Sequence, residues 1–151
     1  MPAEDKRYNP RKTYIDMHWA DVIARELEQR GKEHVIATGT SISGLIHLGN
    51  AGDVIIGEVV QRALKHKGIS ARLIWIMDDG DALRSVPPQM PQTFKEYLGM
   101  PVNALPCPWE CCASFVEHFT KPFLTSLEEI GVNPEPISNT ELYKEADTID
   151  T

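Results

Sequence analysis

The sequence predicts an α/β protein with a parallel sheet, and three observations lead to that prediction. Two short apolar runs, residues 34–39 and 71–77, have the length and composition of buried strands. Between them, residues 49–67 carry apolar side chains at helical spacing, and Gly68 follows as a stop signal. Strand, helix and strand in this order form a βαβ unit, whose crossover is right-handed and whose strands are parallel.

Further elements flank this unit. Residues 16–30 place apolar side chains at helical spacing and predict a helix that ends at Gly31. Residues 115–131 return to that spacing, with Pro122 expected at a kink or a break. Residues 134–143 then predict a third extended segment.

The stretch from Pro87 to Pro108 interrupts the pattern. It contains six of the eleven prolines and little apolar periodicity, so we expect an excursion from the sheet. The expected organisation is an N-terminal helical extension over residues 1–33 and a sheet domain over residues 34–151, with an insertion at about residues 85–113.

Composition and charge exclude several classes of protein. A chain of 151 residues with 42% hydrophobic residues can form one globular domain. Its net charge of -7 argues against a broad non-specific nucleic-acid binder, although a local basic patch would escape this sum. No apolar run approaches the roughly 20 residues of a membrane span, and the first residues lack the apolar core of a secretory signal. We therefore expect a cytoplasmic protein without membrane partners.

Polar residues follow both predicted strands. Thr38, Gly39 and Thr40 end the first strand, and Asp78, Asp79 and Asp81 follow the second. The carboxyl ends of parallel strands share one edge of the sheet, where ligands of open α/β sheets bind. The alternative is that three carboxylates at a strand end only cap and solvate a loop.

The stretch SISGLIHLGN, residues 41–50, joins the first strand to the helix. A helix that begins near Gly49 directs its positive end back at this loop, which suits an anionic ligand such as a triphosphate. His47 and Asn50 can donate hydrogen bonds to phosphate oxygens, and Gly44 permits a tight turn. The pattern is neither a dinucleotide-binding fingerprint nor a P-loop. The simpler alternative is that His47 only caps the helix.

Cys107, Cys111, Cys112 and His118 form a second group of chemically active residues. Three thiols and an imidazole supply the four ligands that a structural zinc site needs. The proline-rich excursion favours zinc, because a segment with few apolar residues needs another means of stabilisation. The alternatives are buried thiols with a surface histidine, or a redox thiol pair.

The order His47-Leu48-Gly49-Asn50, after a strand and Gly44, resembles the His-Ile-Gly-His (HIGH) signature of class I aminoacyl-tRNA synthetases and related nucleotidyl transferases. Together with DDGDALRSVP, FVEHFTKPFLTSLEEIG and ISNTELYK, the chain resembles class I lysyl-tRNA synthetases from about Tyr14 to Tyr143. This resemblance implies a fold of class α/β, a HIGH-type Rossmann-like parallel sheet that is incomplete in this chain, with a zinc-stapled insertion.

The resemblance also implies an activity and a set of site residues. Such enzymes use ATP, with magnesium, to convert lysine to lysyl-adenylate, and then transfer lysine to tRNA(Lys). His47 and Asn50 would be the catalytic residues. The residues expected at ATP are Thr40, Gly44, His47, Gly49 and Asn50. Those expected at lysine are Gly39, Ser41, Asp53, Asp78 and Asp81. Those expected at zinc are Cys107, Cys111, Cys112 and His118, where the family has a similar ligand set.

The second signature of class I synthetases, a Lys-Met-Ser-Lys-Ser-like loop, has no match in this sequence, and neither does an anticodon-reading domain. We therefore expect the N-terminal half of a catalytic domain, with a C-terminal half missing, that binds ATP weakly and activates lysine poorly or not at all. Two rival interpretations remain: a small nucleotidyl transferase of the same fold, or a non-catalytic zinc module that binds RNA or a protein.

Overall fold

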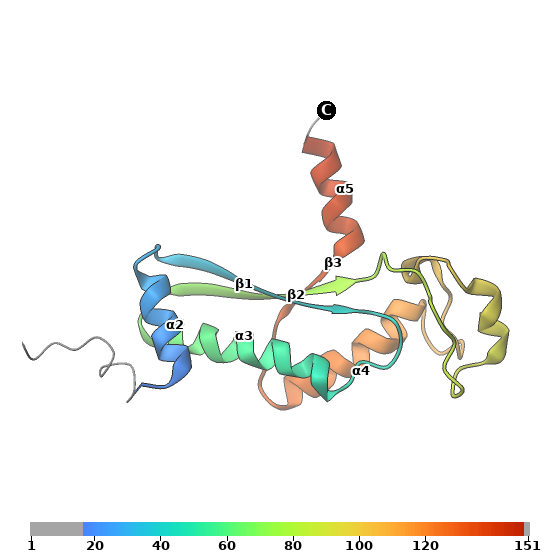
Figure 1. The fold of residues 1–151 in the computed structure, drawn as a ribbon, viewed down its shortest axis with the longest axis horizontal. Coiled ribbons are helices and arrows are strands. Elements are labelled where there is room, and N and C mark those ends of the chain that lie inside the picture. Colours follow the sequence, from blue (N-terminus) through green and yellow to red (C-terminus); the bar gives the residue numbers. More distant parts are fainter. Residues whose placement is uncertain (1–16, 150–151) are drawn as a thin grey trace, which may run out of the picture.

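A parallel sheet with helices on one face organises the protein, as seen in a computed structural model that describes residues 17–149 (Figure 1). The helices are α2 (Trp19–Glu28), α3 (Leu48–His66), α4 (Phe115–Glu129) and α5 (Asn139–Ile149). The strands are β1 (Glu33–Ser41), β2 (Ser70–Asp78) and β3 (Glu135–Ser138), and two short 3-10 helices lie between β2 and α4, η1 (Gln92–Tyr97) and η2 (Val102–Ala104). The predicted α/β class, the parallel strands and the helix between β1 and β2 are confirmed.

The three strands are ordered β1-β2-β3, and both pairs are parallel. In the register of β1 and β2, Gly39 lies opposite Ile76 and Ser41 lies opposite Asp78. The polar ends of these two strands therefore lie side by side, as predicted.

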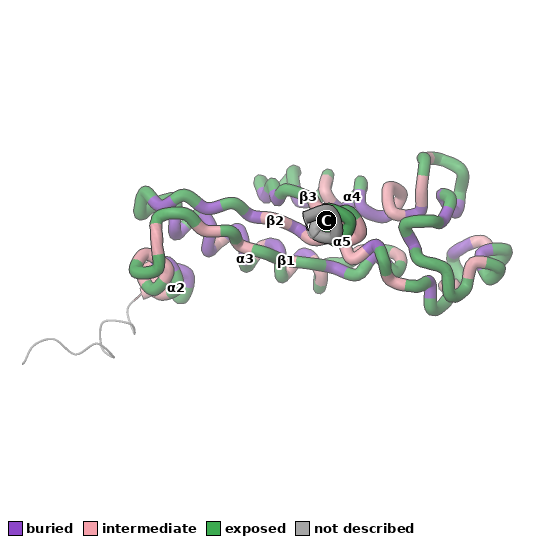
Figure 2. Tube along the Cα trace, turned by 90° about the horizontal axis from the view of Figure 1, so that it is seen from above, coloured by how far each residue is buried: buried purple, intermediate pink, exposed green. Residues whose placement is uncertain are grey.

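Helices α3 and α4 both lie on one face of the sheet, and α5 leaves β3 on the opposite side (Figure 1). Burial along β1 alternates, and Val35 on the other face is 59% exposed. The prediction of a fully buried first strand was therefore wrong, because no helix among residues 17–149 covers that second face. Seen from above, exposed residues alternate with partly buried residues along β1 and with buried residues along the first part of β2 (Figure 2).

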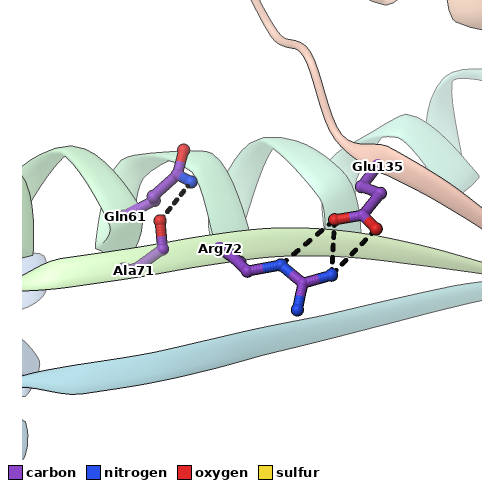
Figure 3. A network of polar contacts seen from close by, with 4 residues as sticks. All are labelled: Gln61, Ala71, Arg72 and Glu135. Atoms are coloured by element: carbon purple, nitrogen blue, oxygen red, sulfur yellow. Dashed lines mark hydrogen bonds and ion pairs between the residues drawn. The ribbon is translucent and has the colours of Figure 1, made fainter.

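Polar side chains help to hold the layers together (Figure 3). Gln61 of α3 donates a buried hydrogen bond of 2.8 Å to the carbonyl oxygen of Ala71 in β2. On the strands, the Arg72 guanidinium binds both carboxylate oxygens of Glu135 with contacts of 2.7–3.2 Å. The buried bond joins α3 to the sheet, and the exposed ion pair links β3 to β2 with a small contribution to stability.

The insertion between β2 and α4 contributes to the core. Its buried apolar side chains pack with Trp75 of β2 and with Phe115 and Phe119 of α4. These side chains are Leu83, Met90, Phe94, Val102 and Leu105. The expectation that the proline-rich segment has too few apolar residues to stabilise itself was therefore wrong.

Two further differences concern the C-terminal elements. Only Glu135–Ser138 of the predicted extended segment is a strand, and α5 begins directly after it. Pro122 does not break α4, which is continuous from Phe115 to Glu129.

Residues 1–16 of the predicted N-terminal extension lie outside the described residues, and α2 packs on α3 through Ala20 and Ala24. Within residues 17–149, no helix has the length and apolar content to cross a membrane.

Candidate functional site

His47 begins α3 as its N-cap. Its Nδ1 atom accepts a hydrogen bond of 3.1 Å from the backbone N–H of Gly49. In return, Asn50 Oδ1 accepts a bond of 3.1 Å from the backbone N–H of His47. These reciprocal bonds form a capping box, so the capping role that the sequence left open is present.

The cap also determines which hydrogen-bond donors remain. Because Nδ1 of His47 accepts a hydrogen bond from the Gly49 N–H, the neutral imidazole carries its own hydrogen on Nε2. Because Oδ1 of Asn50 is occupied, its amide N–H groups are left to donate. The first turn of α3 contains no acidic residue to neutralise the helix dipole. Capping and anion binding are therefore compatible: the cap orients two donors at the positive end of a helix.

Different features of the structure explain why glycine occupies positions 44 and 49 of this loop. Gly44 adopts a φ of 150°, which side chains rarely adopt. A Cβ atom at Gly49 would lie 2.9 Å from Cε1 of the His47 ring, so glycine at this position makes room for the capping imidazole. The φ of Gly44 and the contact at Gly49 therefore account for both glycines before any ligand is considered.

The carboxyl edge of the sheet brings several predicted residues together. Ser41 at the end of β1 donates a hydrogen bond of 2.7 Å to Asp81. Asp78 at the end of β2 accepts one of 3.0 Å from the side chain of Asn139. Gly39 and Ser41 are exposed here, and Asp78 is partly exposed. Gly39, Ser41, Asp78 and Asp81 thus form one polar edge.

Asp79 has a different role from its neighbours. Its side chain is almost fully buried and accepts hydrogen bonds from the hydroxyl of Ser138 at 2.6 Å and from the hydroxyl and backbone N–H of Thr140 at 2.7 and 3.0 Å. Burial alone would raise the pKa of Asp79, but these hydrogen bonds outweigh it and hold the pKa below its usual value. Asp79 therefore joins β2 to the start of α5. This is a structural role, the alternative that the sequence left open for the carboxylates at the end of the second strand.

Two predicted ligand residues lie elsewhere. The Thr40 side chain is buried on the helix-covered face, and its hydroxyl accepts a hydrogen bond of 3.1 Å from the indole N–H of Trp75. Thr40 can therefore reach a ligand only through its backbone. Asp53 is exposed on α3, one turn after Asn50, and no hydrogen bond or ion pair described for residues 17–149 joins it to the strand-end carboxylates.

Sequence reasoning missed Ser138, Asn139, Thr140 and Asn103. The side chain of Asn103, in η2, donates a bond of 2.8 Å to Thr140 and so ties the insertion to this edge. A signal for the first three was present: Ser138 and Glu141 have the S-x-x-E spacing of a capping box. The Ser138 hydroxyl accepts from the backbone N–H of Glu141 at 3.2 Å, so this pattern marks the start of α5.

The predicted zinc ligands converge in space. The potential ligand atoms of Cys107, Cys111, Cys112 and His118 all lie within 4.8 Å of one another. Sγ of Cys107 lies 3.6 Å from Sγ of Cys111 and 3.6 Å from Nδ1 of His118, and Sγ of Cys111 lies 3.2 Å from the same nitrogen. A tetrahedral zinc ion places two sulfur ligands about 3.8 Å apart, and sulfur and nitrogen about 3.6 Å apart. The spacing of Cys107, Cys111 and His118 is close to these values, and Cys112, whose thiol donates a bond of 3.4 Å to the carbonyl oxygen of Ser114, is near enough to complete a set that could hold a four-coordinate metal.

The turn that carries the thiols is strained. Glu110 has a left-handed φ of 54°, which costs a residue with a side chain about 1–2 kcal/mol. Burial would raise the pKa of the Cys107 thiol, but hydrogen bonds from Cys112 and from the backbone N–H groups of Trp109 and Cys111 lower it to about 6. Burial, together with the hydrogen bond to Cys107, raises the pKa of Cys112 to about 12. The turn therefore favours one thiolate, the form of cysteine that binds metals.

Comparison with known proteins gives consistent results. Residues 17–149 match the sequence profile of the family described as "tRNA synthetases class I (K)". The chain is 44% identical over 128 residues to lysine–tRNA ligase 1 of Methanosarcina acetivorans. It is 46% identical over 132 residues to the lysine–tRNA ligase of Methanosphaera stadtmanae, and 42% identical over 130 residues to that of Methanocaldococcus jannaschii. These matches cover 85–86% of the chain but only 24–25% of each relative, so the chain spans about a quarter of their length.

Proposed function

Because the chain belongs to the class I (K) family of tRNA synthetases, we propose that it is the nucleotide-binding, N-terminal part of a lysine–tRNA ligase. The observation that carries this proposal is the cap of α3, which presents Nε2 of His47 and the amide of Asn50 at the positive end of the helix. The relatives' names, lysine–tRNA ligase, supply the substrate class. The cytoplasm, where thiols stay reduced, is the compartment we propose for it.

In the proposed reaction, a carboxylate oxygen of lysine attacks the α-phosphorus of ATP. The bond from that phosphorus to the bridging oxygen breaks, and pyrophosphate leaves. His47 and Asn50 donate hydrogen bonds to phosphate oxygens, and these bonds strengthen as negative charge develops. Magnesium accompanies the ATP. A ribose hydroxyl of tRNA(Lys) then attacks the lysyl carbonyl carbon of the adenylate, the bond from this carbon to the phosphate oxygen breaks, and AMP leaves.

The polar edge of the sheet is the proposed lysine site. Gly39, Ser41, Asp78 and Asp81 lie there, and carboxylates are the groups that pair with an ammonium ion. Asp53 approaches from α3 in this proposal. Asp79 shapes the site by holding β2 to α5 and does not contact the substrate in this proposal, because it is buried and already accepts three hydrogen bonds.

We assign a structural zinc ion to Cys107, Cys111, Cys112 and His118. When bound, it supplies folding free energy to the loop that leads into α4. Since the insertion already has a buried apolar core, zinc is expected to order this loop and not the whole insertion.

Calorimetric titration with magnesium-ATP tests the nucleotide site. We expect weak binding by the wild-type chain and at least about a tenfold loss in His47→Ala, because charge-assisted hydrogen bonds contribute about 1.5–3 kcal/mol. His18→Ala is a matched control, since Nδ1 of His18 caps α2 by accepting from the backbone N–H of Ala20. Both variants remove a helix cap and should lose about 1 kcal/mol of stability, but only His47→Ala should lose affinity for ATP. Equal ATP affinity in the two variants would reject the site.

Elemental analysis of the purified chain tests the metal site. We expect about one zinc per chain, and a large loss of zinc in Cys111→Ser and in His118→Ala. His66→Ala, at an exposed histidine of α3, should keep the metal. Zinc should also be released as pH falls, because protons compete for the thiolates and the imidazole. A wild-type chain purified in zinc-containing medium without bound zinc would contradict the assignment.

A further inference from the structure

The turn that carries the thiols brings two of them together. The backbone N–H of Glu110 donates a hydrogen bond of 3.3 Å to the carbonyl oxygen of Cys107, so the chain reverses between Cys107 and Cys111. Sγ of Cys111 consequently lies 3.6 Å from Sγ of Cys107. The two sulfur atoms of a disulfide lie about 2.05 Å apart, and rotation of the two side chains about their Cα–Cβ bonds can close a gap of this size.

The third thiol is less suited to form a disulfide. Cys112 directly follows Cys111, and neighbouring Cα atoms lie about 3.8 Å apart, whereas disulfides usually join Cα atoms about 4.4–6.8 Å apart. The Cys112 thiol also donates a hydrogen bond of 3.4 Å to the carbonyl oxygen of Ser114. Of the three possible pairs, the fold therefore favours Cys107 with Cys111.

Cys107 and Cys111 differ in their access to solvent. Cys111 is exposed, whereas Cys107 is only 5% exposed. A small oxidant in solution therefore reaches Sγ of Cys111 first, and the buried Sγ of Cys107 is close enough to react with the oxidised atom. Redox-sensing cysteines combine an accessible thiol with a nearby second thiol in this way. In a reducing compartment such disulfides are transient.

His118 connects this turn to the cap of α3. Its Nδ1 atom lies 3.2 Å from Sγ of Cys111, and its ring stacks on the indole of Trp109 with centroids 4.6 Å apart. Both rings line a cavity of about 810 Å³ between α3 and α4, and His47 lines the same cavity. A change in the ligands around His118 therefore alters a wall of the cavity that reaches His47.

We propose that a hydroperoxide oxidises Cys107 and Cys111 to a reversible disulfide, and that this modification empties the zinc site. The inference rests on the zinc ion assigned under the proposed function, and it adds control of that site by oxidation. After the disulfide forms, only Cys112 and His118 remain as ligands. A structural zinc site needs four ligands, and thiolates bind the metal whereas disulfide sulfurs do not, so zinc is released.

With hydrogen peroxide, the reaction proceeds in two steps. The thiolate of Cys111 attacks one peroxide oxygen, an S–O bond forms, the O–O bond breaks, and hydroxide leaves. The thiolate of Cys107 then attacks the sulfenic sulfur, the S–S bond forms, the S–O bond breaks, and a second hydroxide leaves. Two protons from the solvent convert both hydroxides to water. The two thiolates lose two electrons, which the peroxide gains, and a dithiol reverses the modification by exchange.

Peroxide treatment of the zinc-loaded wild-type chain tests this proposal. We expect release of about one zinc ion per chain, measured with a chromogenic chelator, and a fall in free thiols from three to one per chain. The intact mass should correspond to one chain that has lost two hydrogen atoms. Dithiothreitol followed by zinc should restore both the thiols and the bound metal.

Cleavage after glutamate identifies the oxidised pair. One product, residues 97–110, contains Cys107. The next product, residues 111–117, contains Cys111 and Cys112. The two peptides should be linked in the oxidised wild-type chain, with the remaining thiol at Cys112. In the metal-free chain, Cys112→Ser should form this link at the wild-type rate, whereas Cys111→Ser, the matched variant with equally many thiols, should form a link more slowly.

Several results would each overturn the proposal. These are zinc that stays bound after oxidation, a disulfide through Cys112, a link between two chains, a loss of zinc that dithiothreitol does not reverse, and equal rates in the two variants. A chain without zinc before the oxidant is added would refute the zinc assignment as well. Binding of magnesium-ATP at His47 tests the ligase proposal separately, so failure of the redox proposal is distinguishable from failure of the ligase proposal.

Discussion

Two neighbouring carboxylates at the tip of β2 differ in what their hydrogen bonds allow them to do. Asp79 is buried and accepts three hydrogen bonds from Ser138 and Thr140, whereas Asp81 is only partly buried, accepts one from Ser41 and lies 3.9 Å from the guanidinium of Arg84. A buried carboxylate with three hydrogen bonds holds β2, β3 and α5 together, and a partly exposed carboxylate with a single hydrogen bond can still bind a cation. The difference depends on which residues β3 brings to the edge, not on the aspartates themselves.

Asp79→Asn should destabilise the chain by about 1–3 kcal/mol at pH 7, because the amide cannot accept from three donors. Since the pKa of Asp79 in the folded chain lies below the ordinary value of 3.8, its contribution is complete above pH 3.8 and is lost as pH falls below it. Urea unfolding of both proteins from pH 7 to pH 3 measures this, and the difference between them should shrink at the acidic end. Asp81→Asn should lower the free energy of unfolding by less than Asp79→Asn at every pH. Equal losses in the two variants would contradict the different roles assigned to the two carboxylates.

At the scale of elements, close packing of α3 against the sheet depends on one glycine. A Cβ atom at Gly57 would lie 2.7 Å from Cδ1 of Leu73 and 3.0 Å from Cγ2 of Thr38, so the helix lies on the strands without room for a side chain. Gly52 in the same helix has no neighbouring atom within 4 Å of such a Cβ atom. The two glycines look alike in sequence and differ only in what the fold places beside them.

Gly57→Ala and Gly52→Ala should therefore have opposite effects. Alanine gains roughly 0.8–1.0 kcal/mol over glycine inside a helix, and Gly52→Ala should stabilise the chain by about that amount. Gly57→Ala should destabilise it by about 1–3 kcal/mol, because overpacking moves α3 away from the sheet. Thermal and urea unfolding measure both effects. Stabilisation by Gly57→Ala would contradict the prediction and would show that the side chains of Leu73 and Thr38 can move aside.

At the scale of the whole molecule, the sheet is covered on one face only within residues 17–149 (Figure 1). Val35 is exposed on the open face, Ile74 and Ile76 are partly exposed there, and β1 is an edge strand. Open edges and apolar sheet faces favour association with another chain. Relatives that are about three and a half times as long as this chain have further polypeptide that could cover this face.

Val35→Lys should reduce self-association of the chain, because a charge on an edge strand opposes pairing with a second copy. Sedimentation velocity over a range of concentrations measures this. Ile56→Lys is the control, since Ile56 is 54% exposed on α3 and away from the strands, and it should leave association unchanged. A wild-type chain that remains monomeric at high concentration would contradict the expectation.

Features that depend on residues close in the chain could be predicted from the sequence. The βαβ unit, the start of α3 near His47 and the family all follow from spacing, glycines and motifs within short segments. Two short-range features were misread: Pro122, which leaves α4 continuous, and the start of α5 directly after Ser138, for which a local signal was present.

Contacts between distant residues were decided only by the tertiary structure. Ser41 and Asp81 are separated by 40 residues, Asp79 and Ser138 by 59, and local patterns contain no information on which of them meet. The same holds for the open face of β1, for the buried hydroxyl of Thr40 and for the cavity beside Trp109. Secondary structure and caps arise from interactions within a few residues, whereas burial and free hydrogen-bonding capacity depend on which elements pack together.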